Sequence, residues 1–222
     1  MSVTILIPAY NEESRLPETL DKINKEIGCK VIVVDGESTD NTASIAKEYG
    51  ATVITNIGDE GKGCGIKKGF EHVDSEYVVI CDADLPVLTA DIAYLLQICP
   101  VYDMVISSRY HQDAQATRSK LRDIVGKTFS WYVRKALSLP YHDTQCGVKA
   151  AKLESIKEII PQINESGFLF DVELLLLAQQ KGLHVKEVGV TWTEQAGSKV
   201  NVIKDSCKMF LGILKIRSRY QR

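Results

Sequence analysis

The stretch Glu76–Pro86, EYVVICDADLP, joins a short apolar run to two closely spaced carboxylates. Every residue of Tyr77–Ile80 is apolar, which predicts a strand that is buried on both faces of a sheet. Asp82 and Asp84 follow at a spacing of two, so in an extended chain they share one face and can converge on one hard cation. A strand end followed by an ordinary turn is the alternative, because Asp is common in turns. This stretch alone supports the two interpretations equally.

Similar apolar runs recur along the chain and alternate with helical patterns. They predict strands at Val3–Ile7, Lys30–Val34, Ala51–Thr55, Asp103–Ser107 and Val185–Val190, with a further short strand within His142–Lys149. Helical spacing predicts helices at Ser14–Ile27, Thr42–Tyr49, Asp91–Gln97, Lys127–Ala136, Glu154–Ile160 and Phe170–Gln180. Strands that alternate with helices over short connections predict an α/β fold with a mainly parallel central sheet flanked by helices.

The chain contains no linker, repeat or low-complexity segment, so we expect one domain over residues 1–222. We expect a first half at about residues 1–108, with the regular alternation of strands and helices, and a less regular second half at about 109–200. A basic amphipathic tail at about residues 201–222 completes the expected organisation.

The composition is that of a globular protein and limits the classes of partner. The net charge of -2 gives no argument for nucleic-acid binding. The six cysteines are scattered, without a pair at metal-binding spacing, which indicates reduced thiols in a cytoplasmic protein. No apolar run of about 18 residues is present, so we expect contact with a membrane only from its surface, at the cytoplasmic face.

Carboxylates follow three of the predicted strands, with Glu12 after the first, Asp35 after the second, and Asp82 and Asp84 after the fourth. In open parallel sheets the carboxyl ends of the strands form one edge, and ligands bind there. A nucleotide diphosphate held by a divalent metal needs such oxygen ligands.

A glycine-rich stretch, Gly58–Gly69, carries Lys62 and is predicted to be a loop that leads into a helix. Its glycines would let the backbone approach a ligand, although an ordinary flexible turn is the favoured alternative for this stretch alone. The GxxxxGK[ST] pattern of a phosphate-binding P-loop is absent, and no GxGxxG follows the first strand.

Four motifs in order resemble those of the inverting GT-A glycosyltransferases of family 2, which include the polyprenyl-phosphate sugar transferases. These are IPAYNEE at residues 7–13, the turn DGESTD at 35–40, GKG at 61–63 and DAD at 82–84. Three later stretches resemble the dolichyl-phosphate glucosyltransferase branch: DTQCGVK at 143–149, FDVELL at 170–175 and WTEQAGSK at 192–199. The resemblance extends from Val3 to about Lys199, nearly the whole chain.

The resemblance implies a nucleotide-binding half at about residues 1–108, an acceptor half at about 109–200, and a role for each matching residue. The nucleotide sugar would be bound by Pro8, Tyr10, Glu12, Asp35, Lys62, Asp82, Ala83, Gln145, Glu173 and Lys199. A divalent cofactor, Mg²⁺ or Mn²⁺, would have Asp82 and Asp84 as ligands. Arg109, Arg118 and Arg122 would face the acceptor phosphate, and Asp84, Arg109 and Arg122 would be the catalytic residues. Because Pro86 offers no ligand, water or diphosphate oxygen would complete the metal shell.

The implied reaction is inverting transfer of a hexose, first of all glucose from UDP-glucose, to dolichyl or polyprenyl phosphate. GDP-mannose is the alternative donor. A glycan or protein hydroxyl is an alternative acceptor and would need a general base such as Glu173 or Asp171. An alternative from another class of protein is a non-catalytic subunit that binds nucleotide sugar. Its only support is the turn VDGES at residues 34–38 and Pro86.

The tail Cys207–Arg222 interleaves apolar and basic residues and predicts an amphipathic helix. One interpretation places Met209, Phe210, Ile213, Leu214 and Ile216 at the surface of a membrane with anionic lipids. The equally supported alternative packs the helix on the body of the protein or on a partner, either a second copy of the chain or a membrane protein.

Overall fold

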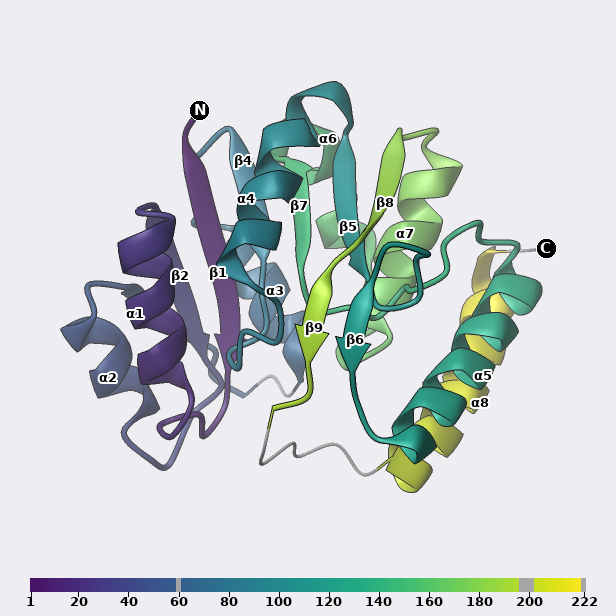
Figure 1. Ribbon diagram of the computed structural model, residues 1–222, viewed down its shortest axis with the longest axis horizontal. Coiled ribbons are helices and arrows are strands. Elements are labelled where there is room, and N and C mark those ends of the chain that lie inside the picture. The colour runs from purple at the N-terminus through teal and green to yellow at the C-terminus, as the bar shows by residue number, and fades with distance from the viewer. Residues whose placement is uncertain (59–60, 196–201, 221–222) are drawn as a thin grey trace.

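The computed structural model describes residues 1–58, 61–195 and 202–220, and for residues 202–207 it describes the backbone alone. A seven-stranded sheet in the order β3-β2-β1-β4-β7-β5-β8 crosses the molecule (Figure 1). Its strands are β1 (Val3–Ala9), β2 (Lys30–Asp35), β3 (Thr52–Thr55), β4 (Tyr77–Ile80), β5 (Met104–Ser108), β7 (Lys149–Lys152) and β8 (Val185–Gly189). Only β7 is antiparallel to its neighbours β4 and β5, so the expected α/β fold with a mainly parallel sheet is confirmed.

Helices cover both faces of this sheet (Figure 1). One face packs against α1 (Leu16–Glu26), α2 (Thr42–Glu48) and α4 (Thr89–Ile98). The other face packs against α3 (Lys62–Phe70), α6 (Leu153–Ile156), α7 (Phe170–Gln180), α5 (Lys120–Leu137) and α8 (Val202–Tyr220). Two short 3₁₀ helices lie at Cys99–Val101 and Ile160–Gln162.

The continuous apolar strands explain this layered arrangement. Successive side chains of a strand point to opposite faces, so Leu6 belongs to the core cluster on one side and Ile5 and Ile7 to the cluster on the other. An apolar side chain that is fully buried in this way contributes about 1.5–3 kcal/mol to stability.

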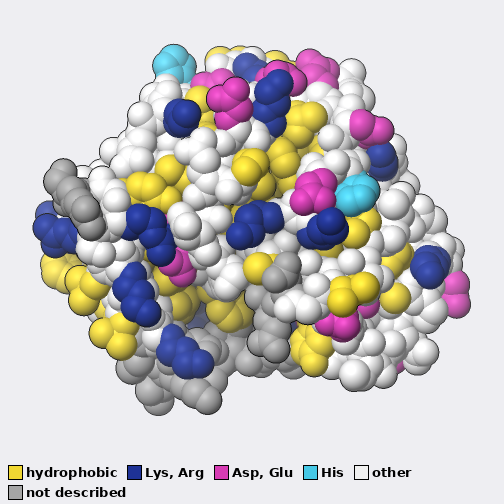
Figure 2. Space-filling model, turned by 180° about the vertical axis from the view of Figure 1, so that it is seen from behind, with side chains coloured by type: hydrophobic (Ala, Val, Ile, Leu, Met, Phe, Trp, Pro, Cys, Tyr) yellow, Lys and Arg dark blue, Asp and Glu magenta, His cyan; other side chains and the backbone are white. Residues whose placement is uncertain are grey.

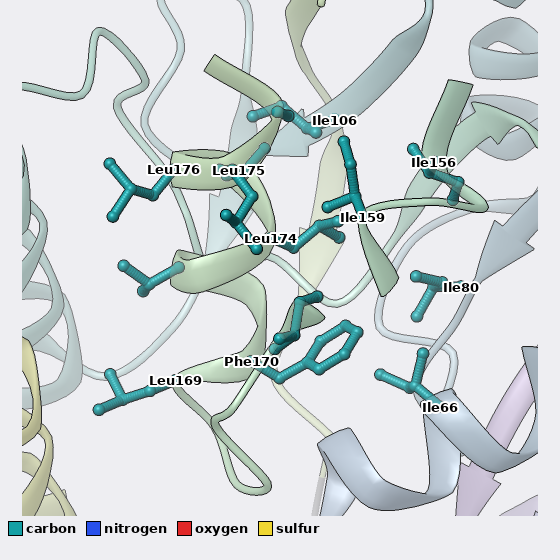
Figure 3. Packing of buried hydrophobic residues seen from close by; sticks show 14 of the residues in the cluster. Ile66, Ile80, Ile106, Ile156, Ile159, Leu169, Phe170, Leu174, Leu175 and Leu176 are labelled. Atoms are coloured by element: carbon teal, nitrogen blue, oxygen red, sulfur yellow. The ribbon is translucent and has the colours of Figure 1, made fainter. Parts of the chain in front are cut away.

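Helix α7 is buried on all sides from Phe170 to Ala178 because it lies in the middle of the core on this second face of the sheet, and apart from Asp171 and Glu173 these residues are apolar. Phe170, Leu174 and Leu175 are fully buried and pack toward Ile66 of α3, Ile80 of β4 and Ile106 of β5 (Figure 3). The predicted bounds of this helix agree with the structure.

Three expectations about local structure are wrong. Most of the glycine-rich stretch is helix α3, and its glycines serve close packing, since a Cβ on Gly63 would lie 2.7 Å from the Glu165 carbonyl oxygen. The strand expected within His142–Lys149 begins only at Lys149, and the preceding residues form a loop. The helix expected at Glu154–Ile160 ends at Ile156, and a 3₁₀ turn containing Pro161 follows.

The last part of the fold is a pair of long helices, α5 and α8, which lie side by side at one edge of the molecule (Figure 1). Ile213 and Ile216 of α8 are fully buried, and Phe210 packs against Phe129 and Tyr132 of α5. This apolar face of the tail therefore packs on the body of the protein, as the second interpretation of the sequence holds. Within the described residues, none of the helices is both long and apolar enough to span a membrane.

A small second sheet links the chain between β5 and α5 to the end of β8. It consists of β6 (Gln115–Thr117) and β9 (Thr191–Thr193), which pair in parallel. The small sheet brings Trp192 of β9 close to the arginines after β5.

Candidate active site

The loops after β1 and β2 are tied together at the carboxyl edge of the sheet. The Asn11 amide donates to Ser38 Oγ at 2.9 Å, and the Glu12 amide donates to Thr42 Oγ1 at 2.7 Å. Asn11 has a φ of 53°, a left-handed conformation that Asn tolerates better than most residues. The loop that carries Glu12 and the loop that follows Asp35 are therefore held together by hydrogen bonds.

Both acids of the DAD motif contact a cation from another part of the chain. Lys62 Nζ lies 2.8 Å from Asp82 Oδ1, and Arg15 Nη1 lies 3.0 Å from Asp84 Oδ2. Arg15 also donates to both carboxylate oxygens of Glu12, at 2.8 and 2.7 Å. The structure thus brings Glu12, Asp82 and Asp84 into one charged cluster with Lys62, as the resemblance implies.

Lys62 also belongs to a buried series of ion pairs that links it through Asp171 to Lys149. Asp171, in the first turn of α7, accepts from Lys62 Nζ at 3.1 Å and from Lys149 Nζ at 2.8 Å. Burial alone would raise the pKa of Asp171, but the two ammonium groups outweigh it and lower that pKa. Burial alone would lower the pKa of Lys62, and the ion pairs with Asp171 and Asp82 raise it. Both groups therefore stay charged at neutral pH.

The DAD motif itself has the chemistry of a divalent-cation site. Burial and the nearby charge of Asp82 raise the pKa of Asp84 to about 6, although Arg15 opposes this shift, so a further cation would stabilise the charged form of Asp84. Carboxylate oxygens are the ligands that Mg²⁺ and Mn²⁺ prefer. Over the described ranges no third His, Cys, Asp or Glu joins the pair in a preformed metal cluster. The residues fit a cation that takes its remaining ligands from outside the protein.

The predicted nucleotide residues line the edge beside this cluster. Asp35 is buried, and its Oδ2 accepts from the Ser38 amide at 3.2 Å. Its Oδ1 is buried with no hydrogen-bond partner in the described part of the chain. Pro8 lies in β1 beside Val34 of β2, Tyr10 after β1 is exposed, and the Ala83 carbonyl accepts from Thr19 Oγ1 at 2.8 Å.

The arginines predicted for the acceptor lie after β5, and the first of them is tightly paired. Arg109 makes a bidentate ion pair with Asp143, at 2.7 Å from Nε to Oδ2 and 2.8 Å from Nη2 to Oδ1. Asp143 is buried, which alone would raise its pKa, but Arg109 outweighs burial and lowers the pKa. Arg122 pairs with Glu194 at 2.7 Å, and Arg118 donates to the Tyr110 hydroxyl at 2.7 Å.

The remaining predicted sugar and phosphate ligands divide into three cases. Gln145 lies beside Arg109 in a small pocket, where its Nε2 donates to the Phe168 carbonyl at 3.1 Å. Glu173 is fully buried, and its carboxylate accepts from the amides of Asn164 and Glu165 and from side chains of α8. That carboxylate is therefore occupied within the protein. Lys199 lies outside the described residues.

Sequence reasoning missed three residues that complete the charged cluster. Arg15 and Lys149 were not singled out, and Asp171 was considered only as a general base. Their partners lie far away in sequence, with 69 residues between Arg15 and Asp84 and 109 between Lys62 and Asp171. Gly147 was quoted only as part of a motif, yet a Cβ there would collide with the Asp82 carboxylate.

Comparisons with known proteins identify the family of the chain. The model of the family "Glycosyl transferase family 2" matches residues 4–156. The chain is 31% identical to a dolichyl-phosphate beta-glucosyltransferase of Dictyostelium discoideum, covering 98% of this chain and 74% of the relative. It is 32% identical to proteins of the same name from Drosophila melanogaster (99% and 76% covered) and Homo sapiens (98% and 75%).

Solved structures share the fold. Glucosyl-3-phosphoglycerate synthase from Mycobacterium tuberculosis in complex with UDP superposes with a TM-score of 0.74 at 19% identity, covering 98% of this chain and 80% of that one. The same enzyme in complex with Mn²⁺ and UDP-glucose gives a TM-score of 0.77 at 18% identity, over 97% and 78% of the two chains. With its GT-A fold and its ordered motifs, the chain belongs to glycosyltransferase family 2, in the branch of the dolichyl-phosphate beta-glucosyltransferases.

Proposed function

We propose that this glycosyltransferase moves glucose from UDP-glucose to a dolichyl-type polyprenyl phosphate, with a divalent metal at the DAD motif. We choose a phosphate as the acceptor because of the charge environment of the Arg118 guanidinium. Throughout the described residues no carboxylate lies within ion-pair distance of it, and its buried Nε has no hydrogen-bond partner. A positive charge held without an acid beside the site suits an anionic acceptor.

The reaction would proceed by in-line displacement. A phosphate oxygen of the acceptor attacks C1 of glucose, the bond from C1 to the diphosphate oxygen breaks, and UDP leaves with the bonding electrons. An α-linked donor then gives a β-linked product. Because a phosphate monoester is anionic at neutral pH, the protein has to position it and stabilise the leaving group, without a strong general base.

The state of Asp171 also supports a phosphate over a hydroxyl acceptor. A general base must be able to take a proton near neutral pH. Asp171 is buried between Lys62 and Lys149, which lower its pKa, and its two oxygens are already engaged. Glu173, the other candidate base, is fully buried, and among the described residues it accepts hydrogen bonds from the amides of Asn164 and Glu165 and from α8.

The donor side of the proposal assigns named roles to the charged cluster. Asp82 and Asp84 would hold Mg²⁺ or Mn²⁺, and a bound cation would stabilise the charge that builds on the leaving diphosphate. Lys62 would contact the diphosphate while Asp171 keeps its ammonium in place. The unpartnered Oδ1 of Asp35 would accept from an N–H of the base, a group that both uracil and guanine offer. Relatives named glucosyltransferases support glucose, and GDP-mannose is the second donor to test.

The experiment offers a short-chain polyprenyl phosphate and a soluble sugar acceptor to the protein, together with labelled UDP-glucose, GDP-mannose and other nucleotide sugars. We expect a lipid-linked glucose that depends on added Mg²⁺ or Mn²⁺ and disappears with EDTA. In Asp84→Asn the rate should fall at least about a hundredfold, because several kcal/mol of stabilisation are lost. The exposed Asp21→Asn on α1 is the matched control. If no donor yields a lipid-linked sugar, the proposal is wrong.

We also propose that the protein works at a membrane surface, where its acceptor resides, on the cytoplasmic side. The support is an exposed stripe on α5 formed by Leu121, Ile124 and Trp131, each at least 60% exposed, with Lys120, Lys127 and Lys135 on the same side. On α8, Leu211 and Leu214 are exposed beside Lys208, Lys215 and Arg217, and Figure 2 shows basic and hydrophobic side chains together at that edge. Apolar and basic side chains on one surface suit anionic lipids.

A further inference from the structure

Two arginines and two aromatic rings form a stack beside the end of β5. The Cζ of Arg109 lies 5.5 Å from the centre of the Tyr110 ring and 5.6 Å from that of Trp192. The Cζ of Arg118 lies 5.5 and 5.7 Å from the same two rings. Each ring therefore contacts both guanidinium groups, at a distance where cation–π attraction is effective.

The two guanidinium groups differ in charge balance. Arg109 is neutralised by its bidentate pair with Asp143. Among the described residues Arg118 donates to neutral acceptors, from Nη1 to the Tyr110 hydroxyl at 2.7 Å and from Nη2 to the Arg122 carbonyl at 2.6 Å. The stack therefore holds one net positive charge close to a neutralised pair, and the aromatic faces offset the repulsion between the two cations.

Gly126 provides the space that this arrangement needs. It lies inside the 18-residue helix α5, and a Cβ there would collide with the Tyr110 hydroxyl and lie 2.9 Å from Nη2 of Arg118. Glycine inside a helix costs about 1 kcal/mol relative to alanine. An alanine would thus favour the helix itself but displace the hydroxyl and the guanidinium.

The surroundings of the stack suit a phosphate that carries a hydrocarbon chain. Arg109, Tyr110 and Gly126 line a small pocket whose further walls include Val125, Phe129 and Met209. Its charged members, Arg109 and Asp143, neutralise each other, so the pocket offers apolar walls beside Tyr110 and Gly126, the residues that contact Arg118, and these walls suit the hydrocarbon next to the phosphate of a lipid.

We propose that Gly126, Tyr110 and Trp192 are positioning residues that hold the Arg118 guanidinium for the phosphate monoester of the acceptor. This inference rests on the proposed function and adds residues to it. Gly126 leaves the space, the Tyr110 hydroxyl orients one edge of the guanidinium, and the Trp192 ring supports its face.

The first test is Gly126→Ala, assayed with a short-chain polyprenyl phosphate in solution. We expect the KM for the acceptor to rise about tenfold, since a misplaced charge-assisted hydrogen bond costs about 1.5 kcal/mol. The kcat and the KM for the nucleotide sugar should stay as they are, and the free energy of unfolding should not fall. The control is Thr128→Ala on the exposed side of α5, which raises helix propensity without touching the stack.

A double-mutant cycle with Tyr110→Phe separates positioning from a general change in the helix. The phenylalanine keeps the ring but removes the hydroxyl that accepts from Arg118, so the KM for the acceptor should again rise several-fold. In the double variant the Cβ of alanine no longer meets that hydroxyl. Its KM should therefore lie well below the product of the two single effects. Independent, multiplying effects would overturn the inference.

The outcomes distinguish this inference from the proposed function. Wild-type protein that transfers sugar to no polyprenyl phosphate overturns the function. An active wild type whose Gly126→Ala variant keeps the normal KM for the acceptor overturns the inference alone. A direct binding measurement supplements the kinetics: in a Trp131→Phe background Trp192 is the only tryptophan, and its fluorescence should report the short-chain polyprenyl phosphate. Gly126→Ala should weaken that binding about tenfold, and equal binding would count against the inference.

Discussion

At the scale of residues, the acids of the DAD motif are held by cations that are themselves held by further acids. Lys62 lies between Asp82 and Asp171, and Arg15 lies between Asp84 and Glu12. A cation that is paired with two carboxylates keeps one ion pair when the other carboxylate binds a ligand instead. This arrangement would let Lys62 and Arg15 stay in place while a metal and a diphosphate bind.

The buried Lys149 gives a prediction at this scale. Lys149 is 2% exposed, and its ammonium contacts Asp171 at 2.8 Å and the Cys146 carbonyl at 2.7 Å. Lys149→Met leaves Asp171 with Lys62 as its one remaining cation, and the free energy of unfolding should fall by about 3 kcal/mol. Urea denaturation measures the change. Adding Asp171→Asn to Lys149→Met should cost less than the sum of the two single changes, and simple additivity would contradict the pairing.

At the scale of elements, α7 links the active site to the C-terminal helix. Asp171 in its first turn contacts Lys62, whereas Glu173, two residues later, accepts from Arg219 at 2.8 Å and from the Tyr220 hydroxyl at 2.6 Å. The same Glu173 carboxylate accepts the amides of Asn164 and Glu165. One helix end thus anchors both the lysine of the cluster and the end of α8.

The prediction for this element depends on pH. Burial would raise the pKa of Glu173, but the hydrogen bonds from Tyr220, the Glu165 amide, Asn164 and Arg219 lower it. A lowered pKa means that this contribution to stability is present above the unfolded-state pKa of about 4.3 and is lost as the pH falls through the folded-state value. Glu173→Gln should therefore lower the free energy of unfolding by about 2 kcal/mol at pH 7.

Urea denaturation over a pH series checks this expectation. The difference between wild type and Glu173→Gln should shrink as the pH falls below about 4.3. Glu165→Gln is the matched control, because its side chain makes only a 3.5 Å contact with Arg219. A difference that stays the same at all pH values would show that the charge of Glu173 has no part in holding α8.

At the scale of the whole molecule, the α5–α8 pair adds an exposed apolar and basic surface close to Arg118. Arg118 lies two residues before the start of α5, and Gly126 lies within this helix. A membrane that contacts the exposed stripe of α5 would bring lipid phosphates near the same helix that positions Arg118. The stripe, more than the apolar face of α8, is the expected contact, because Ile213 and Ile216 of α8 are buried in the core.

Vesicle binding tests this surface. Replacing Leu121, Ile124 and Trp131 by serine should weaken binding to vesicles of phosphatidylcholine and phosphatidylserine at least tenfold, since one large apolar side chain contributes about 1.5–3 kcal/mol when buried. Binding should also weaken as salt is added. Leu88→Ser, an exposed leucine before α4, is the control. Unchanged binding by the triple variant would reject the stripe as the membrane contact.

The sequence by itself determined the order of strands and helices, the mainly parallel sheet and the acidic ends of β1, β2 and β4. These features depend on local periodicity and on short connections, which an amino-acid sequence displays directly. The family motifs also predict that Lys62 and the arginines after β5 belong to the site.

Only the tertiary structure decided which charges meet. The partners of Arg15, Lys62 and Arg109 lie 69, 109 and 34 residues away along the chain, so no local pattern reveals them. It also showed that the glycines of α3 serve packing, and that the space at Gly126 belongs to Tyr110 and Arg118. Contacts between distant segments form only when the chain has folded, because the packing of whole elements sets their geometry.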